Sequence, residues 1–199
     1  NGGDATASSV AKSITSWLAE DEEKVDAGTD FAVAVNSYVG GYGGVGGVGG
    51  TVSVSHYGAI STTGGYADGI LAHSIGGGGG NAGTGSGSTK AADGIKSAAL
   101  NIGLGADGGA GTDGGSVDVH MDDAGASIYT GGHVSRGIFA QSIGGGGGSS
   151  SGGGGSGDAD WDITIGLGAK GSAGGDGGAV SISSEGAITT KGDWSDAIL

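Results

Sequence analysis

Residues 69–75 read Gly-Ile-Leu-Ala-His-Ser-Ile and are followed by five glycines, 76–80. Residues 137–143 read Gly-Ile-Phe-Ala-Gln-Ser-Ile and are also followed by five glycines, 144–148. Ala197-Ile198-Leu199 resembles the start of a third copy. Recurrence of this kind is typical of repeat proteins, in which each structural repeat packs on its neighbours.

Other marks recur in the same order. Gly-Gly-Thr-Val-Ser-Val at 49–54 returns as Gly-Gly-Ser-Val-Asp-Val at 114–119 and as Gly-Gly-Ala-Val-Ser-Ile at 177–182. Ile-Gly-Leu-Gly-Ala occurs at 102–106 and again at 165–169. The repeat is therefore roughly 60–68 residues long. A solenoid coil usually takes about 20 or more residues, so we expect each repeat to supply about three coils.

The strands of this solenoid are predicted to be short. Residues 52–55 and 117–120 alternate apolar and polar side chains, as strands with one buried face do. We expect coils to stack with a continuous core of Val, Ile and Leu along the axis. The fold prediction is an all-β solenoid over residues 1–199, built from about three repeats with Gly-rich loops.

Residues 1–30 do not follow the repeat and are interpreted as an insertion-like segment. Val10, Ile14, Trp17 and Leu18 have the spacing of one helical face. Ser8 or Ser9 would cap the start of that helix. One short helix is therefore predicted near the N-terminus.

Composition excludes several classes of partner. The chain has 199 residues, a net charge of −14 and only seven basic side chains, which argues against nucleic acid and anionic membrane surfaces. It has no Cys, so disulfides and thiolate metal sites are excluded. No stretch is long and apolar enough to insert in a membrane, and there is no signal peptide or initial Met. We interpret the chain as a segment from inside a larger protein.

The glycine-rich stretches allow two interpretations each. The five-glycine runs are either turns leaving a strand or backbone nests for an anion. Residues 40–50 place a larger residue at every third position among glycines. That period of three is the geometry of a polyproline-II helix, and the alternative is a flexible loop.

No metal, cofactor or catalytic residue is predicted. Residues 108–113 match six positions of a calcium-binding Gly-rich repeat, but Gly115 occupies a position that needs an apolar side chain. The four histidines lack metal-ligand spacing. They are His56, His73, His120 and His133.

Catalytic groups do not converge in the sequence. Arg136 is the only arginine, and the carboxylates of Asp158 and Asp160 lie in a Gly/Ser-rich stretch that reads as a solvated loop. Asp122-Asp123 reads as a turn. Three tryptophans could stack on sugars, but Trp161 starts a strand pattern, so packing in the core or at a coil edge is favoured for it. The three are Trp17, Trp161 and Trp194.

The Ser-Ile-Gly₅ marks at 74–80 and 142–148, with the Gly-Gly-X run at 40–50 leading into Thr-Val-Ser-Val, resemble the passenger repeats of large bacterial autotransporters. The resemblance covers nearly the whole chain and is weakest over the first 30 residues. It implies a right-handed parallel β-helix displayed on the cell surface and anchored in the outer membrane by a C-terminal β-barrel translocator. The family's repeats share no catalytic residues.

These observations predict a secreted, surface-displayed structural stalk that mediates cell adhesion or self-association. Its expected partners are a host-cell or matrix surface component, or further copies of itself. The alternatives are a glycan- or receptor-binding module, whose non-repeating patch would lie in residues 1–30, and a β-helical enzyme acting on polysaccharides. Strand edges left unpaired at the ends of the stack predict end-to-end association.

Overall fold

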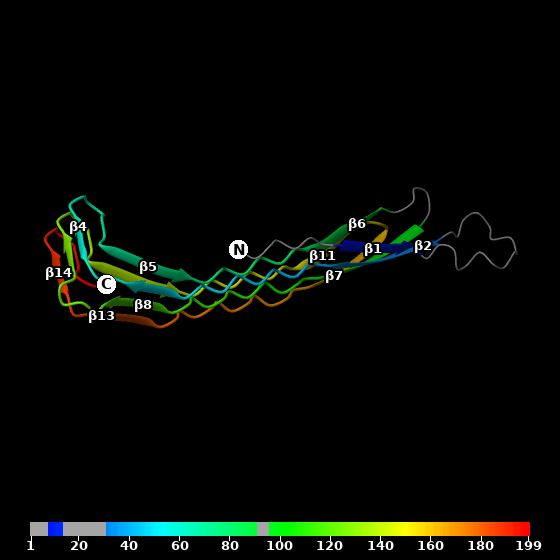
Figure 1. Cartoon of the computed structure of the whole chain (residues 1–199). Coiled ribbons are helices and arrows are strands. Elements are labelled where there is room, and N and C mark those ends of the chain that lie inside the picture. The colour runs from blue at the N-terminus through cyan, green and yellow to red at the C-terminus, as the bar shows by residue number, and fades with distance from the viewer. Residues whose placement is uncertain (1–7, 14–30, 91–95) are drawn as a thin grey trace, which may run out of the picture. The chain divides into compact units, whose positions relative to one another are not determined.

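The computed structural model describes residues 8–13, 31–90 and 96–199 (Figure 1). Within these ranges the chain is all-β, contains parallel sheets and has no helix. The strands are β1 (Ser8–Ser13), β2 (Phe31–Val39), β3 (Val52–Ser55), β4 (Ala59–Thr62), β5 (Ile70–Ile75), β6 (Gly85–Lys90), β7 (Lys96–Leu104), β8 (Val117–Met121), β9 (Ser127–Thr130), β10 (Ile138–Ile143), β11 (Gly153–Asp158), β12 (Trp161–Leu167), β13 (Val180–Ser184) and β14 (Ala187–Thr190).

The sequence repeats pair with one another in register. Strand β5 pairs in parallel with β10 so that Ile70 lies opposite Ile138. Val52 lies opposite Val117 between β3 and β8, and Val117 lies opposite Val180 between β8 and β13. The first two repeats therefore each contribute one strand to every sheet, and the third supplies β12, β13 and β14. Each repeat forms a single layer. The expectation of about three coils per repeat is wrong, because glycine segments lengthen each layer to the full repeat.

The described chain divides into two compact units. Unit 1 takes in the described residues up to Gly46 together with Gly78–Gly111 and Gly146–Gly174. Unit 2 takes in Gly47–Gly77, Thr112–Gly145 and Gly175–Leu199. Every repeat therefore contributes residues to both units.

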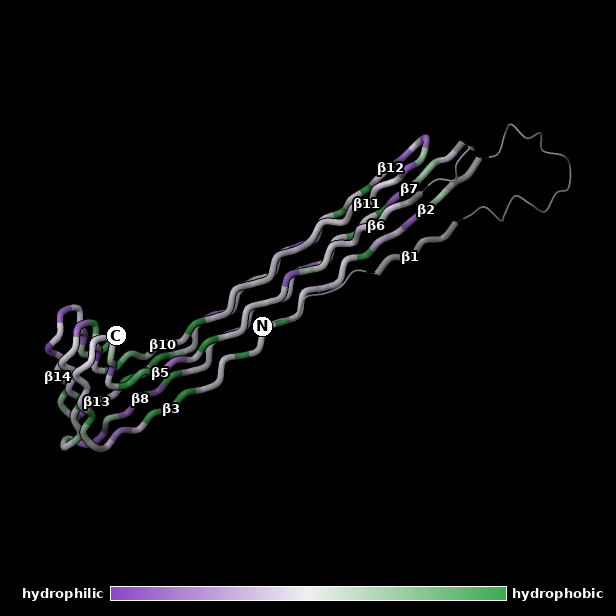
Figure 2. Tube along the Cα trace, turned by 90° about the horizontal axis from the view of Figure 1, so that it is seen from above, coloured by the Kyte–Doolittle hydropathy of each residue, from purple (hydrophilic) through white to green (hydrophobic). Residues whose placement is uncertain are grey.

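Unit 2 has the aliphatic core that the strand pattern predicts. Its sheets have the orders β13-β8-β3, β14-β9-β4 and β10-β5. Alternate side chains of β8 point inward, and Val117, Val119 and Met121 are fully buried. Ile70, Ile128 and Ile138 complete this core from the other two sheets. Figure 2 shows the corresponding hydrophobic positions in green on β5, β8 and β10.

Unit 1 differs from unit 2 in that the inner face of its sheet does not carry large aliphatic side chains. Its four-stranded sheet has the order β1-β2-β7-β12, and the glycine-rich pair β6-β11 lies against its inner face. That inner face carries the buried amides of Asn36 and Asn101, with Asn36 Nδ2 donating to Asn101 Oδ1 at 3.1 Å. Tyr38 is buried where a side chain on Gly87 would overlap its ring. The predicted continuous core of Val, Ile and Leu is thus wrong for unit 1, because only small, flat or hydrogen-bonded groups fit against glycine strands.

The predicted N-terminal helix is also wrong where the structure describes it. Ser8–Ser13 forms β1, which pairs antiparallel with β2. The edge of β2 offers unpaired N–H and C=O groups, and strand pairing satisfies them. The remainder of the predicted helix lies outside the described residues.

Glycine segments connect the strands and have a hydrogen-bond period of three. The amides of Gly40, Gly43 and Gly46 donate to Leu104, Asp107 and Ala110 of the next layer. The segment after β7 repeats this, with Gly105 and Gly108 donating to Leu167 and Lys170. A period of three is that of a polyproline-II helix, so this alternative is supported over the flexible loop.

The five-glycine runs form a second set of such segments. Gly79 donates to Gly146 of the next layer at 2.8 Å, while Gly80 donates to Gly44 of the first set at 2.7 Å. In unit 2, Gly77 donates to Gly47 at 2.7 Å and Gly145 donates to Thr112 at 2.8 Å. The five-glycine runs are therefore neither plain turns nor open loops. Their amides bond to neighbouring glycine segments, which leaves the donors of Gly77, Gly79, Gly80 and Gly145 already used rather than free for an anion.

Close backbone approach explains why these positions are glycine. A Cβ on Gly43 would overlap the carbonyl oxygen of Gly80, and a Cβ on Gly145 would overlap the carbonyl oxygen of Gly77. Gly146, by contrast, has open space where its Cβ would stand. The segments pack backbone on backbone, as in collagen, where glycine is required at the crowded axis.

Gly145→Ala is therefore expected to lower the free energy of unfolding by about 1–3 kcal/mol, the usual cost of overpacking. Gly146→Ala is the matched control one residue away, and it should leave stability unchanged or raise it by roughly 0.5 kcal/mol through the unfolded chain. Chemical denaturation of both variants measures the difference. Equal stabilities for the two would show that the segments are not packed on each other.

Candidate functional site

Three turns stack in unit 2 and carry different side chains at equivalent positions. They cover residues 62–69, 130–137 and 190–197, and are called the turn stack below. Each begins with a threonine whose Oγ1 donates across its own turn to the carbonyl five residues on. The distances are 2.7, 2.6 and 2.8 Å. One turn is therefore built three times.

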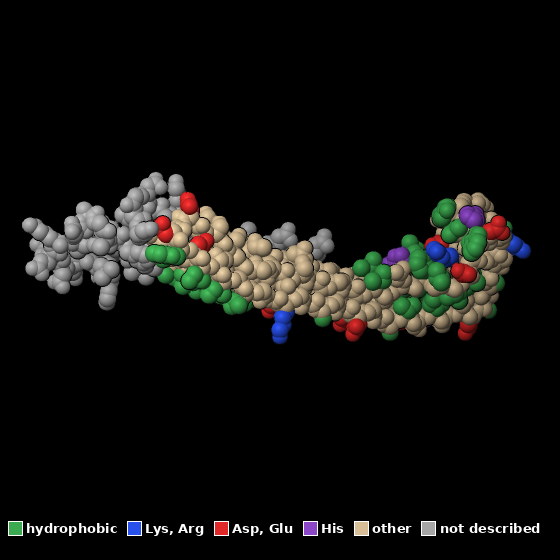
Figure 3. All heavy atoms as spheres, turned by 180° about the vertical axis from the view of Figure 1, so that it is seen from behind, with side chains coloured by type: hydrophobic (Ala, Val, Ile, Leu, Met, Phe, Trp, Pro, Cys, Tyr) green, Lys and Arg blue, Asp and Glu red, His purple; other side chains and the backbone are tan. Residues whose placement is uncertain are grey.

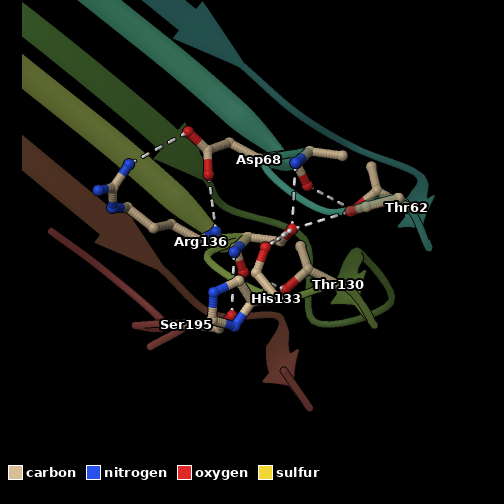
Figure 4. Close-up of polar contacts among 9 residues, drawn as sticks. Thr62, Asp68, Thr130, His133, Arg136 and Ser195 are labelled. Atoms are coloured by element: carbon tan, nitrogen blue, oxygen red, sulfur yellow. Dashed lines mark hydrogen bonds and ion pairs between the residues drawn. The ribbon is translucent and has the colours of Figure 1, made fainter. Parts of the chain in front are cut away.

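Serine hydroxyls tie the layers together. Ser135 is fully buried, and its Oγ donates to the carbonyl of Gly64 at 2.9 Å while accepting from the amide of Ala67 at 3.0 Å. Ser195 does the same one layer on, donating to Gly132 at 3.0 Å and accepting from the Ser135 amide at 2.9 Å. Figure 4 shows Ser195 and the layer-spanning bonds within the stack.

One position of each turn has a left-handed backbone without being glycine. Tyr66, Val134 and Trp194 have φ values of 60°, 52° and 59°. Backbone bonds place them in one column, because Tyr66 N donates to His133 O and Val134 N donates to Asp193 O, both at 2.9 Å. The left-handed conformation costs a non-glycine residue about 1–2 kcal/mol. Three such residues in register show that the stack imposes this conformation.

The column directs aromatic rings to solvent. Tyr66 is 76% exposed and Trp194 is 80% exposed. The ring of His133, from the middle layer, meets that of Tyr66 edge to face with centroids 6.1 Å apart. The surface thus combines two exposed aromatic rings with hydrogen-bonding groups.

Charged groups flank the column. The Asp68 carboxylate accepts from the Arg136 amide at 2.7 Å and lies 3.6 Å from the Arg136 guanidinium (Figure 4). The same guanidinium lies 4.5 Å from the centroid of Phe139, in cation–π geometry. Its Nε is buried and has no hydrogen-bond partner within the described part of the chain. Arg136 is thus fixed over the start of β10.

The turn stack gathers three residues that the sequence singled out separately: His133, Arg136 and Trp194. The sequence signal for the site was weak. In each repeat a Gly-Ala step and an isoleucine, beginning at Gly58, Gly125 and Gly186, are followed within a few residues by Thr and Gly. Nothing in residue type reveals a left-handed tyrosine or valine.

The other sequence candidates have structural partners. Asp160 Oδ2 accepts from the Ser97 amide at 2.8 Å and thus links β12 to β7. Asp113, at the end of the calcium-like stretch, accepts from the Asp176 amide at 2.8 Å, and Gly108 donates to Lys170. Asp122 accepts from Ser183 Oγ at 3.0 Å.

The remaining histidines and tryptophans lie apart from the turn stack. His73 packs edge-on against Phe139, and His120 Nδ1 lies 2.9 Å from Ser183 Oγ. His56 is half-buried, and among the described residues its Nε2 has no hydrogen-bond partner. Trp161 is 57% exposed on β12, so it is not a core residue. Trp17, and most of the patch predicted in residues 1–30, lie outside the described residues.

The described residues hold neither a metal-ligand cluster nor a membrane-spanning helix. Across 8–13, 31–90 and 96–199 no three His, Cys, Asp or Glu side chains come together as metal ligands. Over the same ranges, no helix has the length and hydropathy to span a bilayer. Comparison of the chain with protein-family models, with curated proteins and with solved structures finds no match in any of the three.

Tyr66→Gly is expected to leave the free energy of unfolding unchanged or to raise it by up to about 1 kcal/mol, because glycine adopts φ of 60° without strain. Tyr57→Gly is the control, since Tyr57 is 67% exposed and has no positive φ. Tyr57→Gly should lower the free energy of unfolding by roughly 0.5–1 kcal/mol, because glycine loses more backbone entropy on folding. Thermal unfolding of the two variants decides. A Tyr66→Gly protein as destabilised as Tyr57→Gly would show that the turn stores no strain.

Proposed function

We propose that this chain is a non-enzymatic structural and adhesive segment of a bacterial autotransporter passenger, folded as a right-handed parallel β-helix. The resemblance of its repeats to such passengers supports the assignment. Layers that pair in register and reuse the same turn three times support the solenoid. On this proposal the segment is displayed outside the cell and held at the outer membrane by a translocator elsewhere in its parent protein.

The observation that carries an adhesive role is the division between constant and varied positions in the turn stack. Threonine opens every turn, and an Ala or Ser hydrogen-bonded across layers follows the left-handed residue each time. Between them, the equivalent positions hold Gly65, His133 and Asp193 in one column and Tyr66, Val134 and Trp194 in the next. A fixed scaffold thus presents different side chains side by side, as binding surfaces of repeat proteins do.

The glycine segments suit an exported protein. Their packing depends on backbone hydrogen bonds, and the chain has neither Cys nor Pro. Folding therefore requires no disulfide formation and no prolyl isomerisation. A chain that crosses membranes unfolded and folds outside the cell benefits from both.

Glycan binding at the turn stack is the second candidate. Tyr66 and Trp194 have exposed rings and lie in the layers on either side of Val134. Stacked layers are about 4.8 Å apart, so the two rings are separated by roughly 10 Å. His133 and Asp193 supply hydrogen-bonding groups in the adjacent column. An extended, neutral oligosaccharide matches this surface better than an acidic one, because the chain carries a net charge of −14.

Beads coated with the protein test the adhesive role. They are expected to bind host cells or immobilised matrix proteins, or to aggregate, several-fold above beads coated with an unrelated acidic protein. The double variant Tyr66→Ala/Trp194→Ala should lose most of the binding to cells or matrix. Tyr42→Ala, which removes an exposed tyrosine outside the turn stack, should retain it. Wild-type beads that neither adhere nor aggregate would contradict the proposal.

A glycan array separates the second candidate from the first. Binding to neutral oligosaccharides that falls at least tenfold in the Tyr66→Ala/Trp194→Ala variant, and not in Tyr42→Ala, identifies a glycan site. Cell or matrix adhesion with no glycan bound assigns the turn stack to a protein receptor instead.

A further inference from the structure

The outward face of the four-stranded sheet in unit 1 is apolar. Residues of β2, β7 and β12 alternate between the two faces, and the inner positions carry small, flat or hydrogen-bonded side chains, such as Ala99, Tyr38 and Asn101. The outward positions therefore receive the large aliphatic side chains. They are Val35, Val39, Leu100, Ile102, Leu104, Ile163, Ile165 and Leu167; they are called the outward face below.

The outward face is ordered in columns; its β12 residues and Val39 are exposed, and its remaining residues are half-buried. Ile163 is 60% exposed, Leu167 is 53% and Val39 is 46%. The strand register sets Val35 opposite Leu100 and Leu100 opposite Ile163, while Val39, Leu104 and Leu167 form another column. Figure 3 shows a run of hydrophobic side chains on the unit 1 part of the surface. Ordered aliphatic columns make a flat, regular surface.

None of the eight residues that define the outward face is charged, although the chain as a whole is strongly acidic. Ser37, opposite Ile102, completes these columns, and Trp161, opposite Ala98 and 57% exposed, extends the same face at the start of β12. The acidic side chain of β12, Asp162, points inward and accepts from Asn101 Nδ2 at 3.0 Å. The charged side chains that give the chain its net charge of −14 are not among these eight residues, so burying the eight leaves no charge without a partner.

We infer that the outward face of unit 1 binds the same face of a second copy of this chain. Two such faces are self-complementary, because a two-fold interface brings the same patch of each copy together. Sheets packed face to face lie about 10 Å apart with interdigitated side chains, which suits columns of Leu, Ile and Val. The inference deepens the self-association part of the proposed function and depends on no residue of the turn stack.

The size of the face sets the strength of this contact. Nine residues of β7 extend roughly 30 Å, and three strands about 4.8 Å apart give a patch of several hundred Å². That is below the roughly 800 Å² per partner of a stable complex. The dimer should be weak in solution and become effective when many copies are displayed together on one surface.

Salt distinguishes this interface from a polar one. Two copies with a net charge of −14 repel each other, and added salt screens that repulsion while leaving apolar contact intact. The dissociation constant of a dimer formed through the outward face is therefore expected to fall when salt is raised from about 0.05 to about 0.5 M, because the Debye length shortens over that range. Association through charged pairs such as Asp68 and Arg136 would weaken.

Sedimentation equilibrium of the full chain is the test. The wild type is expected to show a monomer–dimer equilibrium, and Ile163→Lys should raise its dissociation constant at least tenfold. Ser181→Lys on β13 makes the same charge change at an exposed position of unit 2 and should not. Circular dichroism confirms that both variants fold. Tyr66→Ala/Trp194→Ala should dimerise normally even where adhesion is lost, so this inference and the adhesive role can fail separately.

Cysteine cross-linking locates the contact, because the chain has no cysteine of its own. Ile163→Cys is expected to form a disulfide-linked dimer under mild oxidation well before Ser181→Cys does. A wild type that remains monomeric at every concentration and salt would overturn the inference. So would a dimer that survives Ile163→Lys and is lost in Ser181→Lys, since that result assigns association to the strand edges of unit 2.

Discussion

Backbone hydrogen bonds between glycine segments, formed where no Cβ has room, control how this chain is layered. Gly43 and Gly145 approach neighbouring carbonyls so closely that a methyl group would overlap them. Because the bonds recur every third residue and reach both the next layer and the opposite set of segments, most of the cohesion there comes from the main chain. Side chains at the remaining positions point outward and are free to vary, as Tyr42 and Val45 do.

This constraint also explains the contrast between the two units. In unit 2, strands with substantial side chains face one another, and Val, Ile and Met fill the space between the sheets. In unit 1 the inner face of the sheet meets β6 and β11, which are composed mainly of Gly and Ser. A flat tyrosine and hydrogen-bonded asparagines fit there, so the aliphatic side chains face outward. The apolar outward face is thus a consequence of glycine packing on the other side.

Much of the layering follows from the sequence. Matching Ile70 with Ile138 and Val52 with Val117 and Val180 in the sequence reproduces the strand register. The number of coils per repeat does not follow, because ordinary coils are shorter and glycine segments do not look like parts of a layer. Alternation along β7 reveals two faces but not which one is inside. The left-handed φ of Val134 cannot be predicted from the sequence, because valine strongly disfavours that conformation.

Amide hydrogen exchange across the five-glycine run tests the central claim most directly, because it reports on each backbone donor separately. The amides of Gly76, Gly77, Gly79 and Gly80 donate to Ile143, Gly47, Gly146 and Gly44. They should exchange orders of magnitude more slowly than the amide of Gly78, which has no such bond among the described residues. Gly145 should likewise be slow and Gly146 fast. Uniformly fast exchange through both runs would contradict the account, because it would mean that the glycine segments are solvated loops.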